Sequence, residues 1–332
     1  MKNNPLNQIQ SQSHRCGFTL VELLVAIGII MVLIGILLPA LGKVSTKAKA
    51  TSTTATMNEF AKACDVFYTQ FGYYPGIVPE AMLAATVTPP ISGTENALLH
   101  LMGGAIRNDD PIYANVQPPG DWQEFTFGTL GPNGTGQVRV KINPNNIGKG
   151  PRIEGKQYES FFTPKDAQLK IAAGQSGQTS PLPDLLDAWG QPIGYIRSSR
   201  PTGLLTGAID DNPQFFIEPL LPYFNSNGLG DLTIDQNANC VITGPAAVNN
   251  RAYLAQLIRH PAMGSFAVLA DARAGTPRGK YFLFSAGSDG IFFANTGDGP
   301  TPIATTLSFT GADARKPDVV TTYNDIVVSG GG

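Results

Sequence analysis

The chain has 332 residues, of which 42% are hydrophobic and only 14% are charged, with a formal net charge of −2 at pH 7. This length allows one large domain or two ordinary ones, and the slightly acidic balance offers no basic surface for nucleic acid. Glycine and proline number 37 and 26, which favours a loop-rich domain over a helical bundle.

The N-terminus combines a polar leader with a long apolar run. Residues 1–17 carry basic side chains and no acid, which by the positive-inside rule keeps them on the cytoplasmic side of a membrane. Leu23 to Leu41 is interrupted only by glycines and Pro39, and it has about the 20 apolar residues that a membrane-spanning helix needs. We therefore expect a membrane segment, with the rest of the chain exported.

Glu22 lies at the beginning of this apolar run. A charge at a membrane face is costly, so a specific role is expected for this carboxylate. An ordinary signal peptide has small residues at a cleavage site after the apolar run, whereas here the distinctive junction, Gly17-Phe18, precedes it. Cleavage at that junction would keep the apolar segment in the mature protein.

Gly17, the following Phe18-Thr19-Leu20-Val21-Glu22 and the apolar run together resemble the class III signal of type IV pilins and type II secretion pseudopilins. The resemblance implies that prepilin peptidase cleaves after Gly17 and methylates the new amino terminus at Phe18. It also implies that Glu22 pairs with the terminal amine of a neighbouring subunit and that Pro39 kinks the helix. Two opposite charges in lipid are tolerated only together, so this pairing would favour assembly. The alternative is a plain signal anchor with an incidental glutamate.

The helix is expected to continue beyond the membrane. Residues 42–56 are rich in Lys, Ser, Thr and Ala, which suits a segment leaving the bilayer, and Gly72 is expected to end the helix. From Phe18 to Phe71 such a helix would be roughly 80 Å long. Apolar residues then recur at steps of three and four, which predicts one face covered by a sheet or another layer; they are Met57, Phe60, Cys64, Phe67 and Phe71. The phrase from Phe67 to Pro75 again resembles the pseudopilin family.

Two cysteines remain in the mature chain, because Cys16 belongs to the leader. Cys64 and Cys240 could form a disulfide in an oxidising compartment. Cys64 falls on the apolar helix face, however, and a free, buried cysteine is the commoner arrangement at such a position.

Few strands are indicated in the middle of the chain. Glu124 to Leu130 and Gln137 to Ile142 flank Gly131-Pro132-Asn133-Gly134, which predicts a β-hairpin. Further on, Asp187-Ala188-Trp189-Gly190-Gln191-Pro192 resembles a phrase that opens the sheet in major pseudopilins. There Trp189 is expected to be a large core anchor, and Gly194 to Arg197 to begin a strand.

The C-terminal region suggests two strands and a cation site. Gly264 to Asp271 and Lys280 to Ser285 are expected to be strands, and Ser285-Ala286-Gly287-Ser288-Asp289-Gly290 follows. Oxygen ligands on glycine-rich loops suit calcium. The resemblance to major pseudopilins implies a calcium site in this region; its candidate ligands are Asp289 and Asp325, followed by Asp298 and the Ser285 carbonyl. The alternative is two turns in which aspartates cap local backbone amides.

Catalysis finds little support in the sequence. His100 and His260 have no cysteine or carboxylate at metal-ligand spacing, and no nucleophile elbow or phosphate-binding glycine loop occurs. A structural role is favoured for both histidines, and the chain is expected not to be an enzyme.

These patterns predict an α+β, pilin-like fold in which a long N-terminal transmembrane helix packs on a small antiparallel β-sheet with elaborated loops. The expected segments are a cleaved leader at 1–17, the membrane half of the helix at 18–41, its periplasmic half at 42–72, and a globular head at 73–332 with insertions at about 80–183 and 198–279.

The resemblance implies a structural subunit of a type II secretion pseudopilus, anchored once in the inner membrane with its head in the periplasm. Its partners would be other pseudopilin subunits, prepilin peptidase, the inner-membrane assembly platform and the lipid bilayer. Two alternatives remain open: a type IV pilus subunit for adhesion or motility, and a signal-anchored ligand-binding protein or enzyme outside the cytoplasm.

Overall fold

The structure is a computed structural model. It describes residues 19–85, 91–116, 121–130, 136–171, 182–217, 255, 257–261, 275–290, 292–293, 320 and 325–331. The chain divides into two compact units, Met1–Ala48 and Lys49–Gly332, and each is described by itself; the second is called the head below.

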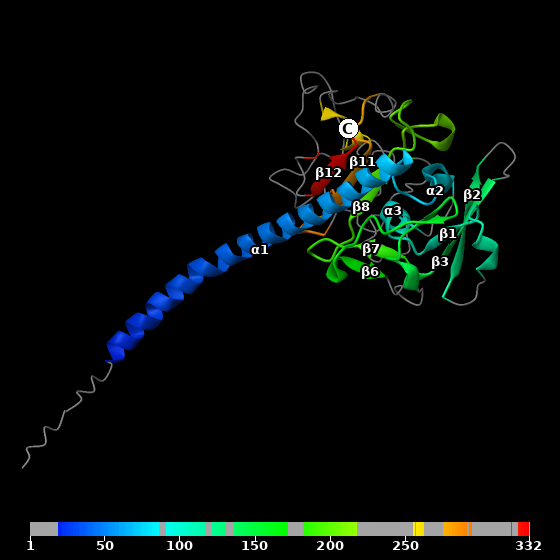
Figure 1. Cartoon of the computed structure of the whole chain (residues 1–332). Helices are drawn as coiled ribbons and strands as arrows, with labels where there is room; N and C mark the ends of the chain where they lie inside the picture. The colour runs from blue at the N-terminus through cyan, green and yellow to red at the C-terminus, as the bar shows by residue number, and fades with distance from the viewer. Residues whose placement is uncertain are drawn as a thin grey trace, which may run out of the picture. The chain divides into compact units, whose positions relative to one another are not determined.

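Helix α1 (Leu20–Phe71) has 52 residues and carries Pro39 in its interior (Figure 1). It ends as expected at Gly72, whose φ of +77° is a backbone conformation that glycine adopts readily. The Gly72 amide donates to the Tyr68 carbonyl at 2.7 Å, which closes the last turn. The helix therefore begins within two residues of the predicted start and ends at the predicted residue.

The predicted apolar face of α1 is confirmed. Met57, Phe60, Cys64 and Phe67 are fully buried. They share one core with side chains from the strands and from helix α3 (Gly93–Met102). Cys64 is a free, buried thiol, as favoured from the sequence, and burial raises its pKa well above the usual range.

The sheet that covers this face has the order β12-β11-β8 and is antiparallel. Its strands are β8 (Gly194–Arg197), β11 (Tyr281–Ser285) and β12 (Ile326–Gly330). Figure 1 shows the three strands beside the part of α1 that belongs to the head. The predictions of a strand at 194–197 and of one ending at Ser285 are confirmed.

A second antiparallel sheet has the order β1-β3-β2. Its strands are β1 (Ala105–Arg107), β2 (Gln123–Leu130) and β3 (Gly136–Ile142). The predicted hairpin pairing of β2 with β3 is confirmed. Phe127, Val140 and Ile142 from this sheet pack in a second core with Leu83 of helix α2 (Glu80–Ala85).

The remaining strands are short. Strand β4 (Arg152–Ile153) pairs with β5 (Lys156–Gln157), and β6 (Leu169–Ile171) with β7 (Pro183–Leu185), both antiparallel, whereas β9 (Thr206–Gly207) pairs in parallel with β10 (Phe215–Phe216). Single 3₁₀ turns occur at Tyr113–Asn115, Pro144–Asn146, Asp166–Gln168 and Ile209–Asp211. The predicted strand 264–271 and the second cysteine, Cys240, lie outside the described residues.

The prediction for Trp189 was wrong, because its side chain is only partly buried and does not belong to the core. The largest fully buried side chains on the sheet are instead Tyr195 and Tyr281. The architecture as a whole is the expected α+β, pilin-like one: a long, apolar N-terminal helix and small antiparallel sheets.

Candidate functional site

The first turn of α1 holds the candidate assembly residue. The Glu22 carboxylate accepts hydrogen bonds from the Thr19 amide at 2.9 Å and from the Thr19 hydroxyl at 2.8 Å. In return the Glu22 amide donates to the Thr19 hydroxyl oxygen at 3.2 Å. This reciprocal arrangement is a capping box, in which an N-cap Thr and a Glu three residues later satisfy the free amides of the helix start. Glu22 therefore has a local partner within its own chain.

The other N-terminal candidates are placed only in part. Gly17 and Phe18 lie outside the described residues, so the expected cleavage site has no described geometry. Pro39 lies inside α1. Proline has no amide hydrogen to donate within the helix and commonly kinks it, but the kink itself stays a prediction.

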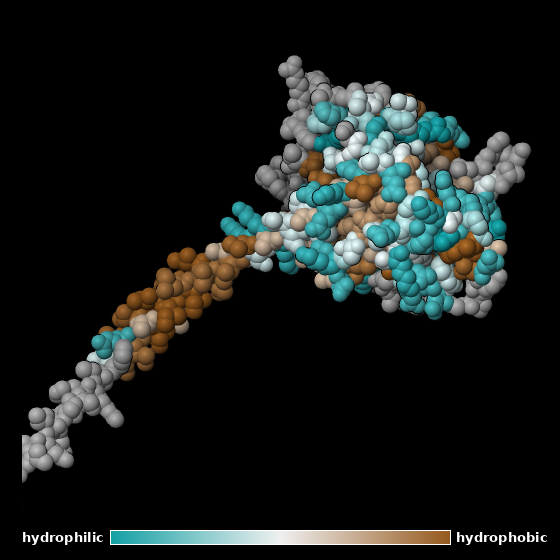
Figure 2. Space-filling model, in the orientation of Figure 1, coloured by the Kyte–Doolittle hydropathy of each residue, from teal (hydrophilic) through white to brown (hydrophobic). Residues whose placement is uncertain are grey.

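The first part of α1 is apolar on all sides. Figure 2 shows this segment as a continuous hydrophobic surface. Its large apolar side chains from Leu20 to Leu41 have exposed fractions between 45% and 79%. By length and composition α1 could cross a membrane. The segment is thus suited to anchoring the protein in a bilayer.

Within the head, polar contacts join the last part of α1 to the rest of the unit. The Thr53 hydroxyl accepts from the Ala188 amide at 3.0 Å, and the Thr56 hydroxyl accepts from the Gln168 side chain at 2.5 Å. The Tyr281 hydroxyl donates to the Ala61 carbonyl at 2.9 Å. These bonds fix the rotation and height of the helix against the strands, which apolar packing alone specifies less sharply.

Two phrases that resembled pseudopilins meet in space. Asp187 accepts from the amides of Trp189 and Gln191 at 2.8 and 2.9 Å, which builds the turn before β8. Its second carboxylate oxygen accepts from the Ser285 hydroxyl at 2.6 Å, at the end of β11. Asp187 therefore connects the turn and the strand, which is the fold role expected of this phrase.

The calcium candidates are dispersed over several roles. The Asp325 carboxylate accepts from the Phe293 amide at 3.0 and 3.1 Å; this is a backbone amide, as in the alternative, but one 32 positions away rather than a local one. Asp289 lies exposed in the turn 287–290, and Asp298 is outside the described residues. Within the described part of the chain, no group of three or more His, Cys, Asp or Glu residues could hold a metal ion. The described aspartates are therefore not part of such a group, and calcium binding stays a prediction.

His100 has a structural role, as favoured from the sequence. Its ring is buried on α3, 4.8 Å from the Phe67 ring, and its Nδ1 accepts from the Gly76 amide at 3.1 Å. Burial, and then the nearby Arg197 and Arg107, lower its pKa to about 3. The ring is therefore neutral at physiological pH, as this acceptor role requires.

Comparison with known proteins agrees with the N-terminal assignment. Residues 12–38 match the family model described as the prokaryotic N-terminal methylation motif. The matched segment contains Gly17, Phe18 and Glu22. No curated protein and no solved structure matches the chain.

This match, together with the α+β fold, supports a type IV pilin-like protein. Proteins of that class are structural subunits rather than enzymes; prepilin peptidase processes them, and they assemble into pilin-type filaments. The motif is not specific for a pseudopilus or for a pilus, so the particular filament is argued below.

Two important residues were missed in the sequence. Thr19 was visible as the first residue of a Thr-x-x-Glu capping box. Arg197, described below, gave no local signal, because its partner Glu80 lies 117 positions away in the chain.

Proposed function

We propose that this protein is a structural subunit of a type II secretion pseudopilus, processed by prepilin peptidase and assembled from the inner membrane to drive protein export. The observation that carries the proposal is the methylation motif at residues 12–38, which includes most of the exposed apolar part of α1. Two features resemble pseudopilins in particular: the aromatic phrase at the end of α1, and the Asp187 turn that leads into β8.

In this proposal the apolar part of α1 anchors the subunit in the inner membrane, with the head in the periplasm. Cleavage after Gly17 exposes the amine of Phe18, and Glu22 of one subunit pairs with this amine on a neighbour. An unpaired charge in lipid is costly, so pairing favours subunits that have joined the filament. The assembly platform would then extrude the filament, which pushes its substrates outward.

Intact mass and N-terminal peptide analysis of the protein from native membranes tests this proposal. We expect a chain that begins at methylated Phe18 and lacks residues 1–17. The same measurement in cells without prepilin peptidase should give the uncut chain. An uncut Met1 start in cells with active peptidase would contradict the filament role and favour a signal-anchored binding protein.

The second candidate, a type IV pilus subunit, is supported by the same motif, and location separates the two. A pseudopilus subunit should remain with the cell after surface filaments are sheared off. When its gene is deleted, proteins that are normally secreted should accumulate in the periplasm. A pilus subunit should appear in the sheared fraction, and its deletion should impair adhesion or motility while secretion continues.

Calcium binding by the C-terminal turns is also proposed, with Asp289 and Asp325 as ligands. Both carboxylates are hard oxygen donors of the kind that calcium prefers. Calcium should then raise the thermal midpoint of the purified full chain, and Asp289→Asn should abolish this shift. If calcium leaves the midpoint unchanged, Asp325 acts only as the cap of the Phe293 amide.

A further inference from the structure

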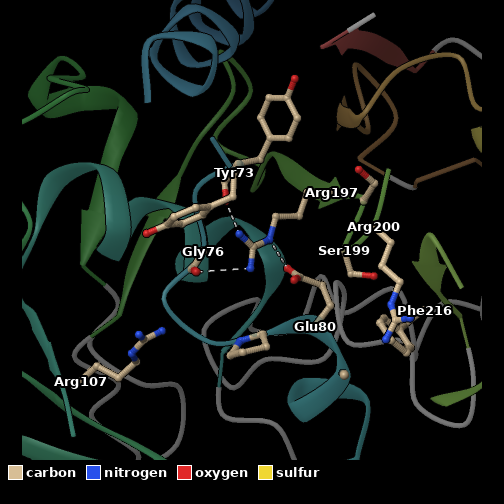
Figure 3. A pocket seen from close by; sticks show the side chains of 12 residues that line it. Tyr73, Gly76, Glu80, Arg107, Arg197, Ser199, Arg200 and Phe216 are labelled. Atoms are coloured by element: carbon tan, nitrogen blue, oxygen red, sulfur yellow. Dashed lines mark hydrogen bonds and ion pairs between the residues drawn. The ribbon is translucent and has the colours of Figure 1, made fainter. Parts of the chain in front are cut away.

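A cavity of about 330 Å³ opens in the head where the loop after α1 meets the end of β8 (Figure 3). Its volume is at the lower end of the range for small-molecule sites, about 300–1,000 Å³. The side chains that matter for its chemistry are three arginines, one glutamate and two aromatic rings: Arg107, Arg197, Arg200, Glu80, Tyr73 and Phe216.

Arg197 and Glu80 form a fixed, neutral part of the wall. Their side chains are only 9% and 3% exposed, and the Arg197 Nε donates to a Glu80 carboxylate oxygen at 2.5 Å. Other guanidinium nitrogens of Arg197 donate to the carbonyls of Tyr74, Gly76 and Val78. A side chain held by this many hydrogen bonds has little freedom to move toward a ligand. Arg197 therefore shapes the cavity, while its charge is balanced by Glu80.

Arg200 contributes charge that no carboxylate of the described residues balances. Its side chain is exposed, and it donates to the neutral Asn212 amide oxygen at 2.7 Å. In the described ranges, no ion pair includes Arg200. The Arg200 guanidinium can thus bind an external anion without first breaking an ion pair with a carboxylate of the described residues.

Arg107 contributes a second charge on the other side of the Arg197–Glu80 pair in Figure 3. Its Nε and one terminal nitrogen donate to the Asp109 carboxylate, which does not line the cavity, so a ligand bound there would share the Arg107 guanidinium with Asp109. Among the described residues that line the cavity there are three guanidinium groups and a single carboxylate, that of Glu80. His100, whose Nδ1 accepts from the Gly76 amide, has its pKa lowered first by burial and then by Arg197 and Arg107.

We propose that this cavity binds a small ligand that carries carboxylate or phosphate groups, with Arg107 and Arg200 as its charged contacts. Arginine suits this role because its planar fork matches the two oxygens of a carboxylate or phosphate. The exposed ring of Tyr73 offers an apolar surface for the body of the ligand. This function is additional to filament assembly, and it gives the head a recognition role that no other observation assigns.

Isothermal titration calorimetry on the full chain in non-ionic detergent tests the proposal, with digalacturonate as the carboxylate probe and pyrophosphate as the phosphate probe. The fully methyl-esterified digalacturonate keeps the sugar rings and lacks the charges. We expect at least one of the two anions to bind at least about tenfold more tightly than the ester. The affinity for that anion should decrease as the salt concentration is raised. The stronger of the two anions identifies the acid group that the cavity prefers.

Variants locate the binding. Arg107→Gln together with Arg200→Gln should lower the affinity for the preferred anion by at least about tenfold, because both charged contacts are lost. Arg139→Gln is the matched control: this arginine is half-exposed on β3, pairs with Glu124 and does not line the cavity. The affinity of this control variant for the preferred anion should equal that of the unmodified protein. The thermal midpoints of all variants should show that each has folded.

Three results would overturn the proposal. The first is no heat of binding for either anion, and the second is equal affinity for digalacturonate and its ester where digalacturonate is the preferred anion. The third is unchanged affinity in the folded double variant, which would place any binding elsewhere on the protein.

Discussion

Glu22 is the residue on which the proposed assembly depends, and its capping box changes how a substitution there should be interpreted. Glu22→Gln keeps an acceptor oxygen for Thr19 but removes the charge that would pair with a neighbour's amine. We therefore expect Glu22→Gln to be processed and to remain in the membrane, while filament yield drops by at least about tenfold, since the pairing is charge-assisted. Quantitative blotting of sheared or sedimented filaments against total protein measures this.

The matched control removes the cap and keeps the charge. Thr19→Val deletes the hydroxyl partner of Glu22, which costs the helix start about 1 kcal/mol. Filament yield should then stay close to that of the unmodified chain. If instead Thr19→Val is as defective as Glu22→Gln, the carboxylate acts through its helix cap rather than through a neighbour.

Asp184 gives the head a distinctive dependence on pH. Burial, and then the nearby buried carboxylate of Glu95, raise the pKa of Asp184 to about 9, while Lys170 opposes the shift. An unfolded aspartate has a pKa near 3.9, so the folded state binds a proton between about pH 4 and 9 that the unfolded state releases. Stability from this group is therefore fully present below about pH 4 and decreases as pH rises, by at most about 1.4 kcal/mol per pH unit.

Asp184→Asn tests this dependence, because the amide resembles the protonated carboxyl without being able to ionise. We expect the variant to be more stable than the unmodified protein at pH 8 and to have a flatter stability profile between pH 5 and 8. Urea unfolding followed by circular dichroism at several pH values measures both. Glu124→Gln, at a surface ion pair, should leave the profile unchanged; an unchanged profile in Asp184→Asn would show that Asp184 is ionised in the folded head.

At the scale of elements, helices and strands could be predicted from the sequence where the pattern that defines them is local. The steps of three and four along α1 and the glycine after Phe71 defined the helix, and the turn residues between β2 and β3 defined the hairpin. Helix α3 was missed because it has only ten residues and all of them are buried, so its polar side chains do not mark a solvent-facing side as they would on an amphipathic surface helix. Its Ser92 and Glu95 do form a capping box, a local signal that would have located its start.

The candidate sites divide in the same way. The processing and assembly residues stand together in one short motif, so the sequence was enough to name them. The cavity depends on Arg107, Arg197 and Glu80, which come from distant parts of the chain and meet only when β1, β8 and α2 have packed. No spacing rule links such residues, because their proximity is a property of the tertiary fold.

Packing of α1 on the sheet should dominate the stability of the head. The Phe60 ring is fully buried and lies edge-on to Phe162 at 5.2 Å and to Tyr195 at 5.5 Å. Phe60→Ala should reduce the free energy of unfolding by about 3–5 kcal/mol, because it removes the buried ring and leaves a cavity. Val66→Ala, at a half-exposed position on the same helix, should cost less than about 1 kcal/mol. Equal effects would contradict the packing of this face.

At the scale of the whole molecule, the two compact units differ in what they need from their surroundings. The apolar residues before Ala48 are exposed and need lipid or neighbouring subunits to cover them. The head has its own core, and the α1 side chains in that core begin at Met57. The boundary between the units therefore separates the part whose apolar surface is exposed from the part that folds by burying its own apolar surface.

A chain that begins at Lys49 should accordingly be soluble without detergent and unfold in a single cooperative transition. A chain that begins at Gly72 lacks Met57, Phe60, Cys64 and Phe67, so the β8 and β11 side chains that pack on them would be exposed to water. We expect this shorter chain to aggregate or to bind a hydrophobic dye. Differential scanning calorimetry of both chains measures the outcome, and cooperative unfolding of the chain from Gly72 would show that the helix is an addition to the head rather than part of its core.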